Sequence, residues 1–259
     1  MFRVLRRLGV GGFGEIYEGV NVATNEHVAI KLEPVSTQHP QLQIEAKLYD
    51  KLQNHMRVPK KYFFGREGAF NILVLQKLGE SVYDEMQLYG RMYAPHFKNV
   101  AQHMISLVQK LHEFGYIHRD LKPENFLYDT TSNSYRHLYL IDFGMAKRII
   151  VDGQHIPQIK KQVMVGTLRY ASYANHVAEE QGRKDDLESL GYVLLYCYYG
   201  YLPWQQESDV SMITAKKHKN QRRHLLQFAP TYMQQYFNHI DNLKFDDTPN
   251  YIYLFQLFN

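Results

Sequence analysis

The chain has 259 residues, of which 45% are hydrophobic and 22% charged, a composition typical of a folded globular protein rather than a disordered one. Its formal charge of +4 is too small an excess to indicate nucleic-acid binding by itself. The single cysteine, Cys197, excludes an internal disulfide, and its apolar surroundings predict a buried structural thiol. Neither a signal-peptide pattern nor a membrane-length apolar run is visible, so we expect an intracellular protein of the cytoplasm, the nucleus or both.

The first third of the chain predicts β-strands and one helix. Four β-rich runs are expected, at residues 2–8, 15–20, 27–33 and 71–75. Between the third and fourth runs, residues 41–51 carry apolar side chains at helical spacing. Gly79 then interrupts the pattern, and we take it as the boundary between a lobe of residues 1–78 and a lobe of residues 79–259.

The remainder predicts mainly helices. Residues 97–114 have the apolar spacing of an amphipathic helix, and residues 231–239 are a further candidate. Residues 186–199 are apolar nearly all round, which predicts a buried central helix. Strands followed by helices indicate an α+β fold in two lobes.

Two features of the predicted β-region could serve a nucleotide. A glycine-rich loop at residues 9–14 could bring backbone N–H groups close to phosphate, although a plain hairpin produces the same pattern. Lys31 ends the run Val-Ala-Ile-Lys, and Glu45 follows on the predicted helix. A buried lysine needs a partner for its charge, and pairing with Glu45 would let the ammonium face a phosphate.

A pair of motifs decides the class of protein. His-Arg-Asp-Leu-Lys-Pro-Glu-Asn occupies residues 118–125, and Ile-Asp-Phe-Gly occupies residues 141–144. A polar turn before a strand could explain the first motif but not its spacing from the second. Both are signatures of protein kinases, whose catalysis depends on positioning and charge neutralisation. We therefore predict an ATP-dependent protein kinase.

Further segments narrow the resemblance. Residues 166–172 read Gly-Thr-Leu-Arg-Tyr-Ala-Ser, where most protein kinases end this segment with Ala-Pro-Glu. Residues 183–192 read Arg-Lys-Asp-Asp-Leu-Glu-Ser-Leu-Gly-Tyr, and Leu-Pro-Trp follows at residues 202–204. With Lys-Phe-Asp-Asp-Thr-Pro-Asn-Tyr at residues 244–251, the chain closely resembles the casein kinase I family of serine/threonine kinases over residues 2–258.

The resemblance implies a bilobal protein-kinase fold, with a small β-rich N-terminal lobe that has one main helix and a larger, mostly helical C-terminal lobe. We expect one catalytic domain over residues 1–259 and, unlike in many members of that family, no tail domain. The expected cofactors are ATP and Mg²⁺, and the expected partners are protein substrates with acidic or phosphorylated motifs. A monomer that binds neither nucleic acid nor membrane is expected.

The resemblance also assigns roles to residues. The implied nucleotide contacts are Leu8, Gly9, Val10, Gly11, Gly12, Phe13, Gly14, Ile16, Ala29, Lys31, Leu75, Gln76 and Leu78. The implied catalytic residues are Lys31, Glu45, Asp120, Lys122 and Thr167, and the implied Mg²⁺ ligands are Asn125 and Asp142. Asp186 matches a buried aspartate that braces the catalytic loop. Arg169 matches an arginine that binds substrate anions, and Lys160 and Lys161 lie shortly before it in the sequence. A solvated basic face is the alternative for these residues.

The chain departs from the family after Trp204, where the segment is shorter and a basic cluster is missing. A basic run follows, consisting of Lys216, Lys217, Lys219, Arg222 and Arg223, and we expect it to be a solvated helix face rather than a substitute anion site. Residues 145–165 contain no Ser, Thr or Tyr, which predicts an enzyme that is competent without phosphorylation there. A pseudokinase scaffold and a small-molecule kinase remain as alternative functions.

Overall fold

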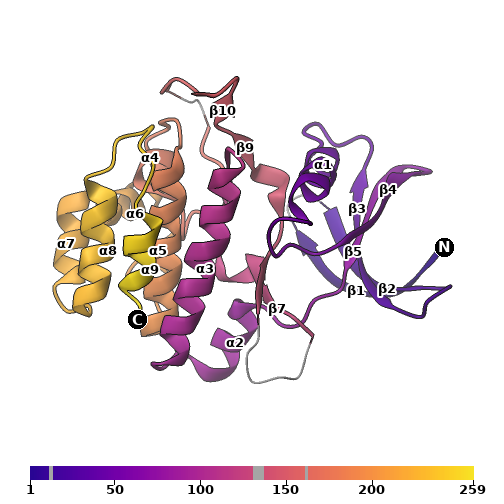
Figure 1. Cartoon of the computed structure of the whole chain (residues 1–259), viewed down its shortest axis with the longest axis horizontal. Helices are drawn as coiled ribbons and strands as arrows, with labels where there is room; N and C mark the ends of the chain where they lie inside the picture. Colours follow the sequence, from indigo (N-terminus) through magenta and orange to yellow (C-terminus); the bar gives the residue numbers. More distant parts are fainter. Residues whose placement is uncertain (12–13, 131–136, 161–162) are drawn as a thin grey trace. The chain divides into compact units, whose positions relative to one another are not determined.

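The computed structural model describes residues 1–11, 14–130, 137–160 and 163–259 (Figure 1). The described chain divides into two compact units. Unit 1 comprises Met1–Glu80 and Leu127–Gly144, and unit 2 comprises Ser81–Phe126 and Met145–Asn259. The predicted α+β order is confirmed, because a sheet with one helix comes first and a mostly helical part follows.

Unit 1 is built on a five-stranded antiparallel sheet with the strand order β1-β2-β3-β5-β4. Its strands are β1 (Phe2–Gly11), β2 (Gly14–Asn21), β3 (His27–Pro34), β4 (Lys61–Glu67) and β5 (Phe70–Gln76). The four predicted strands are present. The sequence did not predict β4, which lies at the edge of the sheet, where charged residues such as Arg66 and Glu67 can face solvent.

The strand register gathers the nucleotide candidates on one face of this sheet. Residues that pair directly across two antiparallel strands point to the same side. One face therefore carries Ile16, Ala29, Lys31, Leu73 and Leu75. The opposite face is closed by a buried cluster of Val28, Ile30 and Val74.

Helix α1 (Leu42–Leu52) packs against β4 and β5 and carries Glu45 on its buried side. Its start is set by the buried carboxylate of Glu33, which accepts hydrogen bonds from the backbone N–H groups of Gln41 at 2.7 Å and Leu42 at 3.0 Å. These groups have no partner within the helix, and a carboxylate also favours the positive end of the helix dipole. Gln41, the predicted first helical residue, is therefore the N-cap.

Unit 2 is mostly helical. Its helices are α2 (Val82–Tyr89), α3 (His96–Glu113), α4 (Tyr173–His176), α5 (Arg183–Tyr199), α6 (Val210–Lys217), α7 (Lys219–Leu226), α8 (Thr231–Asp241) and α9 (Tyr251–Gln256). Within the described ranges, none of the chain's helices is both long and apolar enough to span a membrane.

Short strands and 3₁₀ turns complete the chain. The strands are β6 (Tyr116–Ile117), β7 (Phe126–Tyr128), β8 (Leu138–Leu140), β9 (Lys147–Arg148), β10 (Ile150–Val151) and β11 (Gln154–His155). They pair as β6 with β9, β7 with β8 and β10 with β11. The two 3₁₀ turns are η1 (Pro123–Asn125) and η2 (Phe143–Met145).

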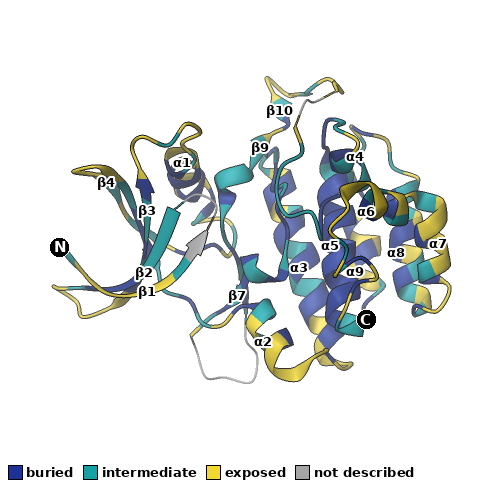
Figure 2. Ribbon diagram, turned by 180° about the vertical axis from the view of Figure 1, so that it is seen from behind, coloured by how far each residue is buried: buried dark blue, intermediate teal, exposed yellow. Residues whose placement is uncertain are grey.

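Helix α5 is the buried centre of unit 2, as predicted (Figure 2). Every residue from Asp185 to Cys197 is buried, and α3 and α8 pack against this helix. The predicted start at residue 186 is three residues late, because the Asp185 carboxylate caps the helix by accepting a hydrogen bond from Gly182 N at 2.8 Å. The Cys197 thiol is buried and free, as predicted, and burial raises its pKa.

The prediction of a solvated basic face is wrong for two of its five residues. Lys217 is fully buried, and Arg222 is only 3% exposed, whereas Arg223 is exposed. Arg222 of α7 donates to Glu188 of α5 at 2.7 Å and to Asp241 of α8. Two carboxylates offset the desolvation of one guanidinium, so this buried ionic cluster joins three helices.

We predict that Arg222→Ala lowers the free energy of unfolding by about 3–5 kcal/mol, because it leaves Glu188 and Asp241 buried without their cation. The matched control Arg223→Ala removes an exposed arginine one position further on and should change stability by less than about 0.5 kcal/mol. Denaturant unfolding of both variants measures the difference. Equal losses in the two variants would contradict the assigned role of Arg222.

Candidate functional site

A buried charge cluster occupies the helix-covered face of the unit 1 sheet. The Lys31 ammonium donates to both carboxylate oxygens of Glu45, at 2.8 and 3.0 Å, and to Asp142 Oδ1 at 3.1 Å. The Lys31 side chain is 16% exposed, Glu45 only 3% and Asp142 22%. The predicted Lys31–Glu45 pair is therefore present, and Asp142 joins it from a segment far along the chain.

The pKa values of this cluster follow from one cation shared by two anions. Burial disfavours the Lys31 ammonium, but attraction to Asp142 and Glu45 outweighs it and raises the pKa of Lys31. Burial also raises the pKa of Glu45, and the neighbouring Asp142 charge adds to that effect. Lys31 therefore keeps its charge at neutral pH, as a group that holds a phosphate must.

Helix α1 also fixes the backbone at Asp142. This residue adopts a left-handed conformation with φ of 66°, and its N–H donates to the Tyr49 hydroxyl at 3.2 Å. The next residue, Phe143, is fully buried and packs edge-on against the Tyr49 ring, with 5.2 Å between ring centroids. One aromatic side chain on α1 thus holds two consecutive residues of the Asp-Phe-Gly motif.

A small cavity of about 50 Å³ lies beside the cluster. Its lining includes Gly14, Ile16, Lys31, Glu45, Asp142 and Gly144. The charged groups at its wall are the Lys31 ammonium and the carboxylates of Glu45 and Asp142.

The other nucleotide candidates of unit 1 occupy distinct environments. Leu75 and Leu78 are buried, Ile16 and Ala29 are half-buried, Leu8 is exposed, and Gly9 and Gly11 belong to β1. The N–H of Gln76, the last residue of β5, donates to the carbonyl oxygen of Lys60, directly before the edge strand β4, at 2.8 Å. Gly12, Phe13 and the side chain of Val10 lie outside the described residues.

In unit 2, the side chain of Asp120 is held by hydrogen bonds to both carboxylate oxygens. Oδ1 accepts from Thr167 N at 2.8 Å, and Oδ2 accepts from the Lys122 ammonium at 2.7 Å. The Asn125 amide nitrogen donates to Asp120 O at 2.9 Å, which leaves the amide oxygen as the ligand end of this side chain. The predicted catalytic residues of this unit therefore converge on Asp120, which is 7% exposed.

The loop that carries Asp120 is braced by Asp186, as predicted. The Asp186 carboxylate accepts from the backbone N–H groups of His118 at 2.6 Å and Arg119 at 2.9 Å, and from His112 Nε2 at 2.9 Å. Burial alone would raise the pKa of Asp186, but these hydrogen bonds and the nearby imidazoles lower it. A charged acceptor thereby stabilises the left-handed backbone of Arg119, whose φ is 68°.

Gly166 is required for the approach of Thr167 to Asp120. Its φ is +80°, a conformation that favours glycine. A Cβ at this position would lie 2.5 Å from Arg119 O and 3.0 Å from Asp120 Oδ1, so a larger residue would push the two segments apart.

The residues predicted to bind a substrate anion lie in different surroundings. Arg169 lines a cavity of about 500 Å³ in unit 2 together with Thr167, but Glu124 and Glu207 also line it. Lys160 is exposed, and Lys161 lies outside the described residues. The presence of two glutamates in this cavity was not foreseen, because they come from segments far apart in the sequence.

The two candidate metal ligands belong to different units, Asn125 to unit 2 and Asp142 to unit 1. Among the described residues, no group of three or more His, Cys, Asp or Glu side chains could hold a metal ion by itself. A carboxylate such as that of Asp142 and an amide oxygen such as that of Asn125 are each hard oxygen donors of the kind that Mg²⁺ prefers.

Sequence reasoning missed several supporting side chains. Glu33 caps α1, Tyr49 holds the Asp-Phe-Gly backbone, and His112 contacts Asp186. No motif marks these residues, because each acts through a tertiary contact. Gly166 is the exception, because a glycine directly before Thr167 could have indicated a left-handed backbone at that position.

We predict that Glu45→Gln lowers the free energy of unfolding by about 2 kcal/mol, because the buried Lys31 charge then keeps only Asp142 as an anionic partner. Asp50→Asn is the matched control, because Asp50 lies on the same helix as Glu45 but its side chain is 52% exposed. The substitution breaks the ion pair between Asp50 and Lys61 of β4. That loss should stay below about 1 kcal/mol. Denaturant unfolding distinguishes the two, and a loss in the control as large as that in Glu45→Gln would contradict the burial argument.

The geometry agrees with a comparison against protein families. The model of the protein kinase domain matches residues 2–245, which is most of the chain and includes every candidate residue named above. A five-stranded antiparallel sheet with one helix, followed by a mostly helical part, is the α+β fold of that domain. The chain belongs to the protein kinase family.

Proposed function

We propose that this protein is a serine/threonine kinase of the casein kinase I type, with one catalytic domain, which transfers the γ-phosphate of ATP to protein substrates. The observation that carries the proposal is the arrangement around Asp120. Both of its carboxylate oxygens are held, one by the backbone of the substrate-side segment at Thr167 and one by Lys122. A fixed carboxylate can orient a hydroxyl group and accept its proton.

The residues divide the work of transfer. Lys31, steadied by Glu45, would hold the α- and β-phosphates. Asp142 and Asn125 are the residues that would hold Mg²⁺, and the ion would supply neutralisation of phosphate charge. The substrate hydroxyl gives its proton to Asp120 as its oxygen bonds to the γ-phosphorus. The bond from that phosphorus to the bridging oxygen breaks, and ADP leaves. Lys122 offsets the charge on the transferring group.

Preference for Ser and Thr rests on the resemblance and on the contact between Thr167 and Asp120. The Lys122 ammonium lies 2.7 Å from Asp120 Oδ2 and 3.5 Å from Thr167 Oγ1. These contacts draw the substrate-side segment close to the catalytic carboxylate. A short aliphatic hydroxyl suits this close spacing better than the long phenol of tyrosine.

Preference for acidic or phosphorylated sites rests on Arg169. Of the two glutamates that share its cavity, Glu207 is paired with Lys216 at 3.2 Å, and burial raises the pKa of Glu124 above its usual range. An anionic substrate side chain would therefore meet Arg169 with less repulsion than the two carboxylates alone would impose.

Competence without phosphorylation is supported by contacts that already order the start of the segment after the Asp-Phe-Gly motif. The Arg119 guanidinium donates to Met145 O at 2.6 Å, and Lys147 pairs with the buried carboxylate of Glu180 at 2.7 Å. Strand β9 in this segment also pairs with β6. These contacts are formed by side chains and backbone of the protein and need no phosphate group. This agrees with the absence of Ser, Thr and Tyr from residues 145–165.

We predict that protein made in bacteria and treated with phosphatase transfers phosphate from ATP and Mg²⁺ to an acidic peptide at an undiminished rate. Asp120→Asn should lower kcat roughly 100-fold or more, because the hydroxyl loses its proton acceptor. A radiolabel transfer assay measures both. An inactive wild-type protein that binds its partners normally would favour the scaffold alternative, and transfer only to small alcohols would favour a small-molecule kinase.

Substrate preference can be tested with a peptide library that carries Ser, Thr or Tyr acceptors with acidic, phosphorylated or basic residues upstream. We expect Ser and Thr peptides with upstream anions to be preferred, and Arg169→Ala to reduce that preference roughly tenfold through lost charge-assisted hydrogen bonds. Arg148→Ala, at an exposed arginine of the same unit, serves as the control. An unchanged preference in Arg169→Ala would exclude Arg169 as the anion contact.

A further inference from the structure

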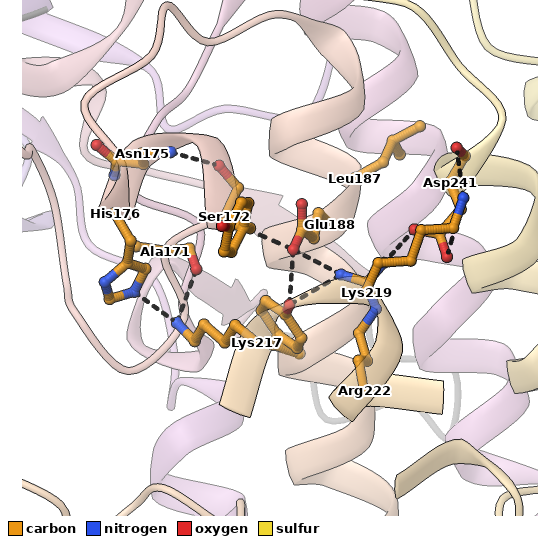
Figure 3. A network of polar contacts seen from close by, with 12 residues as sticks. Ala171, Ser172, Asn175, His176, Leu187, Glu188, Lys217, Lys219, Arg222 and Asp241 are labelled. Atoms are coloured by element: carbon orange, nitrogen blue, oxygen red, sulfur yellow. Dashed lines mark hydrogen bonds and ion pairs between the residues drawn. The ribbon is translucent and has the colours of Figure 1, made fainter. Parts of the chain in front are cut away.

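Lys217, the last residue of α6, is a fully buried lysine with a complete set of acceptors. Its ammonium donates to Leu168 O at 2.7 Å. It also donates to Ala171 O at 2.7 Å and lies 3.1 Å from His176 Nε2 (Figure 3). All three partners are neutral groups of the stretch that runs from the candidate substrate site into α4. An ammonium has three N–H donors, so each donor has one acceptor.

The hydrogen-bond pattern fixes the state of His176. Thr214 Oγ1 donates to Val210 O at 2.7 Å, so the same oxygen accepts from His176 Nδ1 at 3.2 Å. The imidazole then carries its proton on Nδ1 and presents the lone pair of Nε2 to Lys217. Burial and the Lys217 charge lower the pKa of His176 to about 4, which keeps this ring neutral at pH 7.

Aromatic rings complete the surroundings of the ammonium. The nitrogen of Lys217 lies 5.0 Å from the centroid of the Tyr192 ring and 5.3 Å from that of Trp204. Ring faces attract a cation, and this attraction grows when the cation is removed from water. Burial lowers the pKa of Lys217 to about 7, even though the charge of Glu188 raises it. The charged form is the one that all three acceptors and both rings favour.

Trp204 extends the same contact set, because its indole N–H donates to Arg169 O at 2.8 Å. The carbonyls of residues 168, 169 and 171 are therefore all bound by side chains that come from later in the chain. Just beyond them, Glu188 accepts a hydrogen bond from Tyr173 N at 3.2 Å. The backbone that carries Thr167 and Arg169 is thus held on its buried side.

We propose that Lys217 is a positioning residue for the protein substrate: its buried ammonium, with His176 as third acceptor, holds the segment from Leu168 to Ala171 in the shape that presents Thr167 to Asp120 and Arg169 to the substrate. This inference rests on the proposed function. It explains what holds the Gly-Thr-Leu-Arg-Tyr-Ala-Ser segment in place. The Lys217 ammonium binds backbone carbonyl oxygens of this segment, and the partners of this buried cation are not carboxylates.

The kinetic test compares Lys217→Met with wild type. The variant keeps the apolar stem but loses the donors to Leu168 O and Ala171 O, so the KM for an acidic peptide should rise roughly tenfold. The KM for ATP should stay unchanged, because the phosphate-binding cluster of Lys31 and Glu45 belongs to unit 1. Lys219→Met, at a partly exposed lysine two positions along, is the matched control and should leave both constants as in wild type.

A second measurement does not depend on activity. NMR titration of the His176 ring should give a pKa near 4 in wild type and a higher pKa in Lys217→Met, because the facing charge is gone. Should Lys217→Met fail to fold, His176→Leu removes the third acceptor of Lys217 together with the hydrogen bond to Thr214, and it keeps both carbonyl acceptors. This variant should still raise the peptide KM a few-fold with an unchanged KM for ATP.

The outcomes separate the two proposals. A wild-type protein that phosphorylates no peptide refutes the proposed function, while the titration of His176 still tests the contact with Lys217. An active wild type whose folded Lys217→Met variant, or whose His176→Leu variant, keeps the wild-type peptide KM overturns the positioning role. An unchanged His176 pKa in Lys217→Met overturns the contact itself.

Discussion

A buried cation needs partners that replace water, and this constraint organises both units of the protein. In unit 1 the ammonium of Lys31 is bound by Glu45 and Asp142, so a strand, a helix and a distant loop meet at one nitrogen. In unit 2 Arg222 joins three helices through two carboxylates, and Lys217 is bound by neutral acceptors. In the proposed function the first of these clusters would hold phosphate, whereas the Arg222 cluster holds helices together and Lys217 holds the backbone of residues 168–171.

The carboxylate of Asp120, which we propose as the proton acceptor, is fixed by contacts with other segments of unit 2. Asp186 holds the backbone of the loop, Gly166 allows the neighbouring segment to come close, and Thr167 N then reaches Asp120. Each contact is made within unit 2, so the geometry around Asp120 does not depend on a bound nucleotide. Fixed dipoles and charges of this kind lower a barrier because they need no reorganisation during the reaction.

The recognition surface combines opposite charges. Arg169 shares its cavity with Glu124 and Glu207, and Lys216 pairs with the second of these. If the protein selects anionic substrates as proposed, that selectivity would be a difference between attraction to one guanidinium and repulsion from the two carboxylates that share its cavity.

The sequence by itself determined the α+β order, four strands of the main sheet, the buried helix around Cys197 and the residues of the kinase motifs, because these depend on periodicity and on side chains at fixed spacing. Only the tertiary structure decided which basic residues are buried. In the sequence alone, a basic run such as Lys216 to Arg223 is typical of a solvated helix face. Lys217 and Arg222 are buried because residues 168–188 and Asp241 supply acceptors for them. Partners that far apart meet only through folding, and no local pattern marks them.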